Sequence, residues 1–332
     1  MSKNEMAVCD TACTSTPPVR VHRWSLKTGI TRTPEFEKKG LATHAVNVGT
    51  KCGHNCCYCS SGAVLRTHPS FRACGESPFA RGYAIVDPQT PARVAREAAR
   101  IRKRGLVQLC TLTDAWAPEA HAHQLGRRCL EAILSQPDWT VRILTKNASV
   151  RDDLDVVEKY RSRALVGLSV TAPPEKGETV GFLEPYASSI QDRMLVMAEA
   201  AARGLRTYAM FCPVLPLIAD SQADLDRLVQ YAVDCRAEEI FAEPVNPRGP
   251  GLRLCQEALE RNGRHVEADA IKQIRRRANW SHYVAELIGK VQRAIREHSE
   301  ISKLRLLLYP VGLLPQDRSK IEADDAGVIW LR

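Results

Sequence analysis

Six short apolar runs, separated by amphipathic helical patterns, most constrain how this chain folds. The runs are residues 45–48, 106–109, 141–144, 165–170, 206–211 and 239–242. The helical stretches between them repeat apolar residues every three to four positions, as in Leu125, Cys129 and Ile133. Strands that are apolar on both faces are typical of a parallel sheet covered by helices. The pattern therefore predicts an α/β protein, a partial (β/α)6 TIM-like barrel with an N-terminal extension and a C-terminal helical addition.

The regions that flank these repeats divide the chain into three predicted parts. Residues 1–40 are rich in Thr, Pro, Lys and Arg without sustained periodicity, so we predict an N-terminal extension that wraps the body or stays mobile. Residues 41–250 are predicted to form the barrel. Residues 251–332 are predicted to form a C-terminal helical region, with a helix over 281–298 and a strand over 304–309.

Twelve cysteines in 332 residues need an explanation, because a chain of this length can bury a core without disulfide bonds. No apolar run reaches the roughly 18 residues of a membrane span, and the first residues lack the apolar core of a signal peptide. We therefore expect a cytoplasmic protein without a membrane partner. In that reducing compartment, closely spaced thiols are more often metal ligands or catalytic groups than disulfides.

Three cysteines are closely spaced directly after the first predicted strand. Cys52, Cys56 and Cys59 form a C-x3-C-x2-C pattern on a loop that can turn three thiolates toward one point. Soft thiolates select zinc or iron–sulfur clusters. Structural zinc needs four ligands, and no second Cys or His pair lies at a suitable distance. The pattern favours a 4Fe-4S cluster with one open iron; incidental buried cysteines are the structural alternative.

With Tyr58 before the last cysteine and six β/α units around it, the motif resembles that of the radical SAM superfamily. The resemblance implies that Cys52, Cys56 and Cys59 hold a 4Fe-4S cluster whose fourth iron is chelated by S-adenosylmethionine. One electron, from a donor such as flavodoxin or ferredoxin, then cleaves S-adenosylmethionine to methionine and a 5′-deoxyadenosyl radical, which abstracts hydrogen from the substrate. In this interpretation Cys57 faces away and His54 is structural.

Residues 44–250 most resemble the spore photoproduct lyase and DNA repair photolyase-like group. Cys110-Thr111-Leu112-Thr113-Asp114 is similar to its Cys-Thr-Ser-Asp, Leu144-Thr145-Lys146 to its Thr-Lys, and Leu168-Ser169-Val170 to its Phe-Ser-Ile. The resemblance implies that Thr113 and Asp114 meet polar groups of S-adenosylmethionine. It also implies that Lys146 pairs with the methionine carboxylate and that Ser169 contacts the ribose or carboxylate. All four follow predicted strands, where barrels build their sites, although each alone could serve as a cap or loop hydrogen bond.

Two departures from the lyase pattern concern the candidate catalytic residues, Tyr58 and Cys110. In the lyase a second tyrosine follows the last cluster cysteine and forms a hydrogen-return path with a second-strand cysteine; here that position is Ser60. Cys110 stands one residue before the place of that second-strand cysteine, and a one-residue slip on a strand reverses the face of a side chain. We therefore expect a substrate that is related to thymine dimers but different from them.

Other features bear on the substrate. The net charge of +9 permits a nucleic-acid partner, and Arg275-Arg276-Arg277 near Trp280 is either a nucleic-acid surface or a solvated helix face. Residues 60–83 suit a lid or a solvated connector. The segment after the sixth strand offers Glu243, Asn246 and Arg248 to a substrate.

The sequence leaves several questions open. The target is a nucleobase, a small metabolite or a peptide, and the reaction is of lyase or transferase type. Cys9 and Cys13 are weak candidates for a second metal site. A non-catalytic or redox-sensing iron–sulfur protein and a zinc-binding nucleic-acid module are the alternatives from other classes.

Overall fold

A nine-stranded sheet forms the body of the molecule, in a computed structural model that describes residues 19–331. Its strand order is β12-β11-β10-β9-β8-β7-β6-β3-β2. All neighbours pair in parallel except β2 and β3, which are antiparallel. The strands are β2 Thr31–Arg32, β3 His44–Val46, β6 Leu106–Leu109, β7 Thr140–Thr145, β8 Ala164–Ser169, β9 Arg206–Val214, β10 Ile240–Pro244, β11 Leu304–Leu308 and β12 Val328–Trp330.

The predicted parallel α/β sheet is confirmed. The six predicted strands correspond to β3, β6, β7, β8, β9 and β10, and the predicted C-terminal strand corresponds to β11. The sheet ends at β2 on one side and at β12 on the other, and these two strands do not pair with each other. In the described part of the chain the sheet is therefore open.

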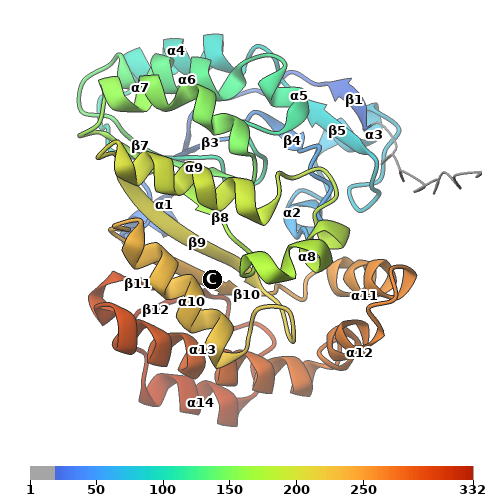
Figure 1. Cartoon of the computed structure of the whole chain (residues 1–332). Coiled ribbons are helices and arrows are strands. Elements are labelled where there is room, and N and C mark those ends of the chain that lie inside the picture. Colours follow the sequence, from blue (N-terminus) through green and yellow to red (C-terminus); the bar gives the residue numbers. More distant parts are fainter. Residues whose placement is uncertain (1–18, 332) are drawn as a thin grey trace, which may run out of the picture.

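Helices cover the sheet between successive strands. Figure 1 shows α4, α6 and α7 along one end of the molecule and α13 and α14 along the opposite end, with the strands between them. The helices are α1 Pro34–Lys38, α2 Ser61–Val64, α3 Pro69–Ala73, α4 Thr90–Arg100, α5 Pro118–His121, α6 Leu125–Leu134, α7 Leu154–Lys159, α8 Gly177–Leu183, α9 Ile190–Ala202, α10 Gln222–Asp234, α11 Gly251–Arg261, α12 His265–Gln273, α13 Arg277–His298 and α14 Pro315–Ala323. Short 3-10 turns lie at Ala148–Asp153, Pro174–Lys176 and Ile301–Lys303.

The two faces of the sheet pack against different partners, because successive side chains of a strand point to opposite faces. On β9, Ala209 and Phe211 belong to the large core shared with the helices. Tyr208 and Met210 alternate with them and pack with Phe241 of β10 in a second, smaller core. That smaller core lies on the face of the sheet opposite the large core, where Phe36 of α1 also packs against it.

A separate three-stranded sheet, in the order β1-β5-β4, was not predicted. Its strands are β1 Arg20–Arg23, β4 Gly49–Lys51 and β5 Tyr83–Val86. Gly49 allows the approach of β4 to β5, since a Cβ there would lie 2.1 Å from the carbonyl oxygen of Ile85. The sequence places Cys52 directly after the first predicted strand, which corresponds to β3. In the structure Cys52 follows β4, a strand of the separate sheet. The predicted connector or lid, residues 60–83, contains α2 and α3 and leads into β5.

The described part of the predicted N-terminal extension joins both sheets, because it contributes β1, β2 and α1. Cys9 and Cys13 lie outside the described residues, so a second metal site there stays a prediction. The division of the chain into three parts stays a prediction as well.

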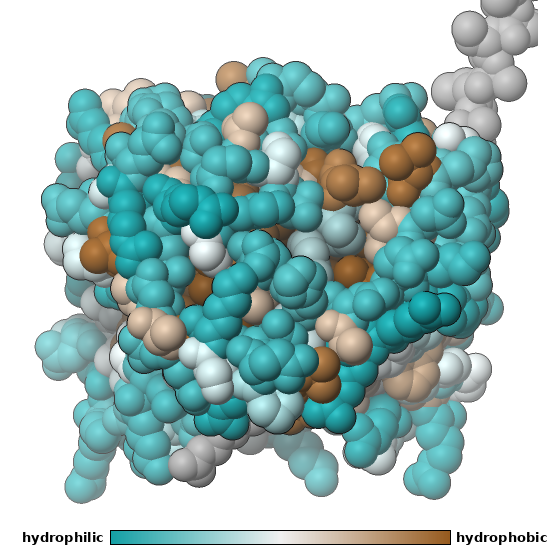
Figure 2. All heavy atoms as spheres, turned by 90° about the horizontal axis from the view of Figure 1, so that it is seen from below, coloured by the Kyte–Doolittle hydropathy of each residue, from teal (hydrophilic) through white to brown (hydrophobic). Residues whose placement is uncertain are grey.

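The surface seen from below in Figure 2 is largely hydrophilic, with hydrophobic residues in separate small groups. Among residues 19–331, no helix has both the length and the apolar character needed to cross a bilayer.

Gly126 in α6 is expected to tolerate no side chain. An added Cβ would lie 2.4 Å from Cε2 of the buried Trp116, whose Nε1 donates to Asp153 at 2.8 Å. Because the bond to Asp153 keeps the buried indole from moving aside, Gly126→Ala should lower the free energy of unfolding by about 1 to 3 kcal/mol. Gly181→Ala in α8 is the control, since its Cβ meets nothing within 4 Å; it should be neutral or stabilising. Urea unfolding followed by circular dichroism measures both, and equal losses would contradict the packing argument.

Candidate functional site

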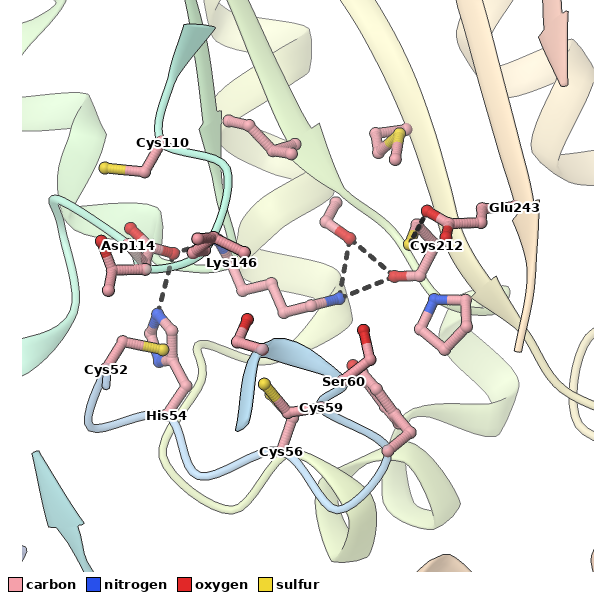
Figure 3. A pocket seen from close by; sticks show the side chains of 18 of the residues that line it. Cys52, His54, Cys56, Cys59, Ser60, Cys110, Asp114, Lys146, Cys212 and Glu243 are labelled. Atoms are coloured by element: carbon pink, nitrogen blue, oxygen red, sulfur yellow. Dashed lines mark hydrogen bonds and ion pairs between the residues drawn. The ribbon is translucent and has the colours of Figure 1, made fainter. Parts of the chain in front are cut away.

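A cavity opens at the carboxyl ends of the central strands. One wall is the cysteine loop that follows β4, and the opposite wall is the end of β9 and β10, with Lys146 crossing between them (Figure 3). The lining residues are Cys52, His54, Cys56, Tyr58, Cys59, Ser60, Ser61, Cys110, Leu112, Thr113, Asp114, Leu144, Thr145, Lys146, Ser169, Met210, Cys212, Pro213, Glu243, Pro244 and Asn246. All three predicted metal ligands and all four predicted cofactor contacts are among them.

The cysteine loop holds three free thiols on the cavity wall. Its backbone is fixed by Glu119, whose Oε1 accepts from the Gly53 amide at 2.8 Å. Asn55, which has a positive φ of 50°, donates from Nδ2 to the Gly53 carbonyl at 2.9 Å. Burial raises the pKa of Cys52, and the negative charges of Cys59 and Glu119 raise it further. A buried thiol beside other negative groups keeps its proton unless a cation neutralises it.

His54 ties this loop to the sheet. Its Nε2 lies 2.9 Å from Oδ2 of Asp114, and its Nδ1 lies 3.0 Å from the carbonyl oxygen of Tyr186. Burial lowers the pKa of His54, but the charge and hydrogen bond of Asp114 outweigh burial and raise it. Both ring nitrogens face acceptors, so the protonated ring donates from both. His54 is therefore a structural link, consistent with the interpretation of the sequence.

Asp114 is also bound to the end of β7. It accepts from Thr145 Oγ1 at 2.8 Å and from the Lys146 amide at 2.8 Å. Burial raises the pKa of Asp114, but the charge of His54 and these hydrogen bonds bring it below its usual value. The carboxylate thus connects the cysteine loop with the turn that carries Lys146; its predicted contact with a cofactor stays a prediction.

Thr113 is placed by Asn47, a residue for which no role was predicted. Oδ1 of Asn47 accepts from the amides of Thr111, Leu112 and Thr113 at 3.0, 2.8 and 3.2 Å. Thr113 Oγ1 in turn accepts from the Val48 amide at 3.2 Å. The loop after β6 is therefore fixed against the end of β3, with Thr113 on the cavity wall.

Lys146 extends across the cavity toward β8 and β9. Its Nζ donates to Ser169 Oγ at 2.7 Å, to the Cys212 carbonyl at 2.9 Å and to Glu184 Oε1 at 3.1 Å. Ser169 also donates to the Cys212 carbonyl, at 2.9 Å. The lysine side chain keeps 15% of its surface exposed. The structure therefore brings the predicted residues Lys146 and Ser169 into direct contact.

Glu184 is the main site residue that sequence reasoning missed. It follows α8 and lies in no motif, 38 positions from Lys146. Arg193 pairs with it at 2.5 Å, and both side chains are only 1% exposed. Burial raises the pKa of Glu184, but Arg193 and Lys146 outweigh burial and lower it to about 2. A charged carboxylate thus anchors Lys146 beneath the cavity.

The two candidate catalytic residues lie in different surroundings. The hydroxyl of Tyr58 donates to Glu184, which joins it to the Lys146 network. Cys110 lines the cavity but is buried in the main core, and in Figure 3 its sulfur points away from Lys146. Their catalytic roles stay predictions.

A further thiol of the cavity, that of Cys212, lies on the wall opposite the cysteine loop. Its Sγ is 3.3 Å from Oε2 of Glu243. Burial raises the pKa of Glu243 and also that of Cys212. Cys57 is absent from the cavity lining; its Sγ faces the carbonyl oxygen of Phe182 at 3.8 Å.

Comparison with known proteins supports the fold. No known protein-family model matches the chain. A solved mutant of spore photoproduct lyase superposes with a TM-score of 0.56 at 16% identity, covering 84% of this chain and 78% of that one. The same lyase complexed with dinucleoside spore photoproduct gives 0.53 at 16% identity, over 77% and 74%. The chain therefore shares the fold of spore photoproduct lyase, as its sequence predicts.

The curated relatives are uncharacterized proteins. One from Acidianus two-tailed virus is 22% identical over 219 residues, which is 65% of this chain and 71% of that protein. One from Methanocaldococcus jannaschii is 21% identical over 54% of this chain and 63% of its own length. One from Mycobacterium tuberculosis is 26% identical over 62% of this chain and 59% of its own length. The last two are thus matched over less than two thirds of their length.

Proposed function

We propose that the protein is an enzyme that holds a 4Fe-4S cluster on Cys52, Cys56 and Cys59 and binds S-adenosylmethionine in the adjoining cavity. The observation that carries this proposal is the convergence of three free thiols and the Lys146 network on one cavity at the carboxyl ends of a parallel sheet. Proteins with a parallel sheet covered by helices build their sites at the carboxyl ends of the strands.

The donor set fits the cluster. Three thiols are the ligands of a 4Fe-4S site with one open iron, and soft thiolates bind iron–sulfur clusters well. The raised pKa of Cys52 and Cys56 reflects burial first. Their thiolates would therefore be formed by the charge of the bound iron. When bound, the two cofactors would supply reductive cleavage of S-adenosylmethionine to methionine and a 5′-deoxyadenosyl radical that abstracts hydrogen from a substrate.

The residues of the chain have three tasks in this proposal. Asp114 and His54 fix the cysteine loop relative to the strand that carries Lys146. Lys146 presents an ammonium group for the methionine carboxylate, with Ser169 beside it. The apolar side chains of Leu112, Leu144 and Met210 line the space and limit the access of water to a reactive radical.

Lys146→Ala is expected to weaken S-adenosylmethionine binding by about 1 to 3 kcal/mol, as for the loss of a charged hydrogen bond. The bound iron should stay unchanged, since within residues 19–331 the Lys146 ammonium bonds to no cysteine side chain, and Glu184 keeps Arg193 as its partner. Equilibrium dialysis of labelled S-adenosylmethionine against reconstituted protein measures the change.

The control for this variant is Lys159→Ala. Lys159 is exposed on α7, 5.3 Å from the ring centre of Tyr160, as Lys146 is 5.5 Å from that of Tyr58. It should bind S-adenosylmethionine like the wild type. Unchanged affinity in Lys146→Ala would remove this lysine from the binding site.

Metal analysis after anaerobic reconstitution tests the class. A content of about four irons per chain is expected for one such cluster. Zinc without iron would favour the zinc-binding alternative. Iron without any binding of S-adenosylmethionine would favour a redox-sensing protein.

A further inference from the structure

The cavity continues into a groove over the ends of β10 and β11. The two share Glu243, Pro244 and Asn246 as lining residues. The outer part of the groove is formed by Arg248, Tyr309 and Val311, and we call it the Arg248 groove. A molecule whose reacting atom lies beside Lys146 would therefore place its remaining part in this groove.

Arg248 is a positioned cation that has no counter-ion in the part of the chain that the structure describes. Its guanidinium lies over the ring of Tyr309, 4.5 Å from the ring centre, and this cation–π contact holds it at the groove wall. Its backbone amide donates a hydrogen bond to Asn246 Oδ1 at 3.0 Å. Within residues 19–331, no carboxylate lies at ion-pair distance from this guanidinium, whereas Arg253 and Arg318 each have one.

The nearest acid does not cancel this charge. Glu243 faces the cavity, where its Oε2 meets the Cys212 thiol at 3.3 Å. Burial raises the pKa of Glu243 more than the charge of Arg248 and the bond to Cys212 lower it, which favours the neutral form of Glu243. A stacked guanidinium keeps its planar row of N–H donors free, and that row matches the two oxygens of a carboxylate or phosphate.

The groove also has an apolar side. Val311 is 69% exposed at its rim, and the ring of Tyr309 forms part of its wall. The combination suits a ligand with a planar or apolar body and one oxyanion group.

We propose that the Arg248 groove is a substrate subsite that binds a carboxylate or phosphate group through the Arg248 guanidinium. The inference rests on the proposed function, because it places that group on the molecule that reacts in the adjoining cavity. The substrate is then an organic oxyanion whose charged end lies in the Arg248 groove and whose reacting end lies in the cavity.

Binding of three small probes tests the subsite. Benzoate and phenyl phosphate carry a ring and an oxyanion, and benzamide is the neutral counterpart of benzoate. Calorimetry on the full-length reconstituted protein at low salt should show that both anions bind at least about tenfold more tightly than benzamide. Tighter binding of benzoate would assign the natural group as a carboxylate, and tighter binding of phenyl phosphate would assign it as a phosphate.

Arg248→Gln should weaken both anions at least about tenfold and leave benzamide unchanged. Arg318→Gln is the matched control, because Arg318 also lies over an aromatic ring, 5.5 Å from the centre of Trp330, but on α14. It removes the same charge and should bind the probes like the wild type. Equal binding by both variants, or benzamide binding as tightly as benzoate, would overturn the proposal.

The readout is independent of radical chemistry. If Arg248-dependent binding is present but S-adenosylmethionine is not cleaved on reduction, the proposed function fails and the subsite stands. If cleavage occurs and both arginine variants bind the probes alike, the subsite fails and the proposed function stands.

Discussion

Replacing Cys56 by alanine is expected to abolish the iron–sulfur cluster. Two thiolates would remain on a loop that must hold four irons, so reconstituted protein should contain less than about half the iron of the wild type. The fold should survive, since Cys56 lies at the cavity wall and the loop keeps its bonds to Glu119 and Asp114. Iron analysis and the visible absorption of the cluster measure the loss.

Cys57→Ala is the matched control, one position along the same loop. Its thiol is buried, faces the carbonyl of Phe182 and does not line the cavity. It should keep full iron and lose only packing, about 1 kcal/mol of unfolding free energy. Equal iron loss in both variants would show that the ligand set is misassigned.

Removing the charge of Glu184 should have the largest effect on stability. Glu184→Gln leaves Arg193, which is 1% exposed, without an anionic partner in the interior. Breaking a buried ion pair by changing one partner costs about 3 to 5 kcal/mol. The loss should appear as a lower urea midpoint, since Lys146 and Tyr58 also exchange a charged acceptor for a neutral one.

The cost should depend on pH. The pKa of Glu184 lies at about 2 in the folded protein, below its ordinary value of 4.5. The stabilisation is therefore fully present above about pH 4.5 and is lost as the pH falls toward 2. The difference between Glu184→Gln and wild type should shrink over that range, and a difference independent of pH would contradict the charge-based explanation.

Glu257→Gln on α11 provides the comparison for this prediction. Glu257 pairs with Arg253 in an exposed i,i+4 bridge. Such pairs contribute about 0.3 to 0.5 kcal/mol, so this variant should unfold almost like the wild type.

The central strands of the large sheet could be predicted because their residues are apolar on both faces. β8 is buried along its whole length, and its sequence is a continuous apolar run. β1, with the sequence Arg-Val-His-Arg, is mostly exposed and carries no such pattern. β5 does carry an apolar run, Tyr83–Val86. Only its first residue, Tyr83, falls in the predicted connector, and no strand is predicted for the rest, because its partners, β1 and β4, were themselves not predicted.

The site was predictable where it depends on strand ends. Lys146 and Ser169 follow adjacent parallel strands, so their meeting at one edge follows from topology. Glu184 and Asn47 were not predictable, because their roles arise from loops folding back over the strands. Asn47, for instance, bonds to amides 64 to 66 positions away. A single sequence holds no signal for such contacts.

Release of 5′-deoxyadenosine tests the central claim most directly. The full-length protein is reconstituted anaerobically with iron and sulfide, mixed with S-adenosylmethionine and reduced with dithionite. We predict that wild-type protein releases 5′-deoxyadenosine and methionine, that Cys57→Ala does the same, and that Cys56→Ala releases neither. Iron-loaded wild-type protein that binds S-adenosylmethionine but releases no 5′-deoxyadenosine on reduction would contradict the proposed function.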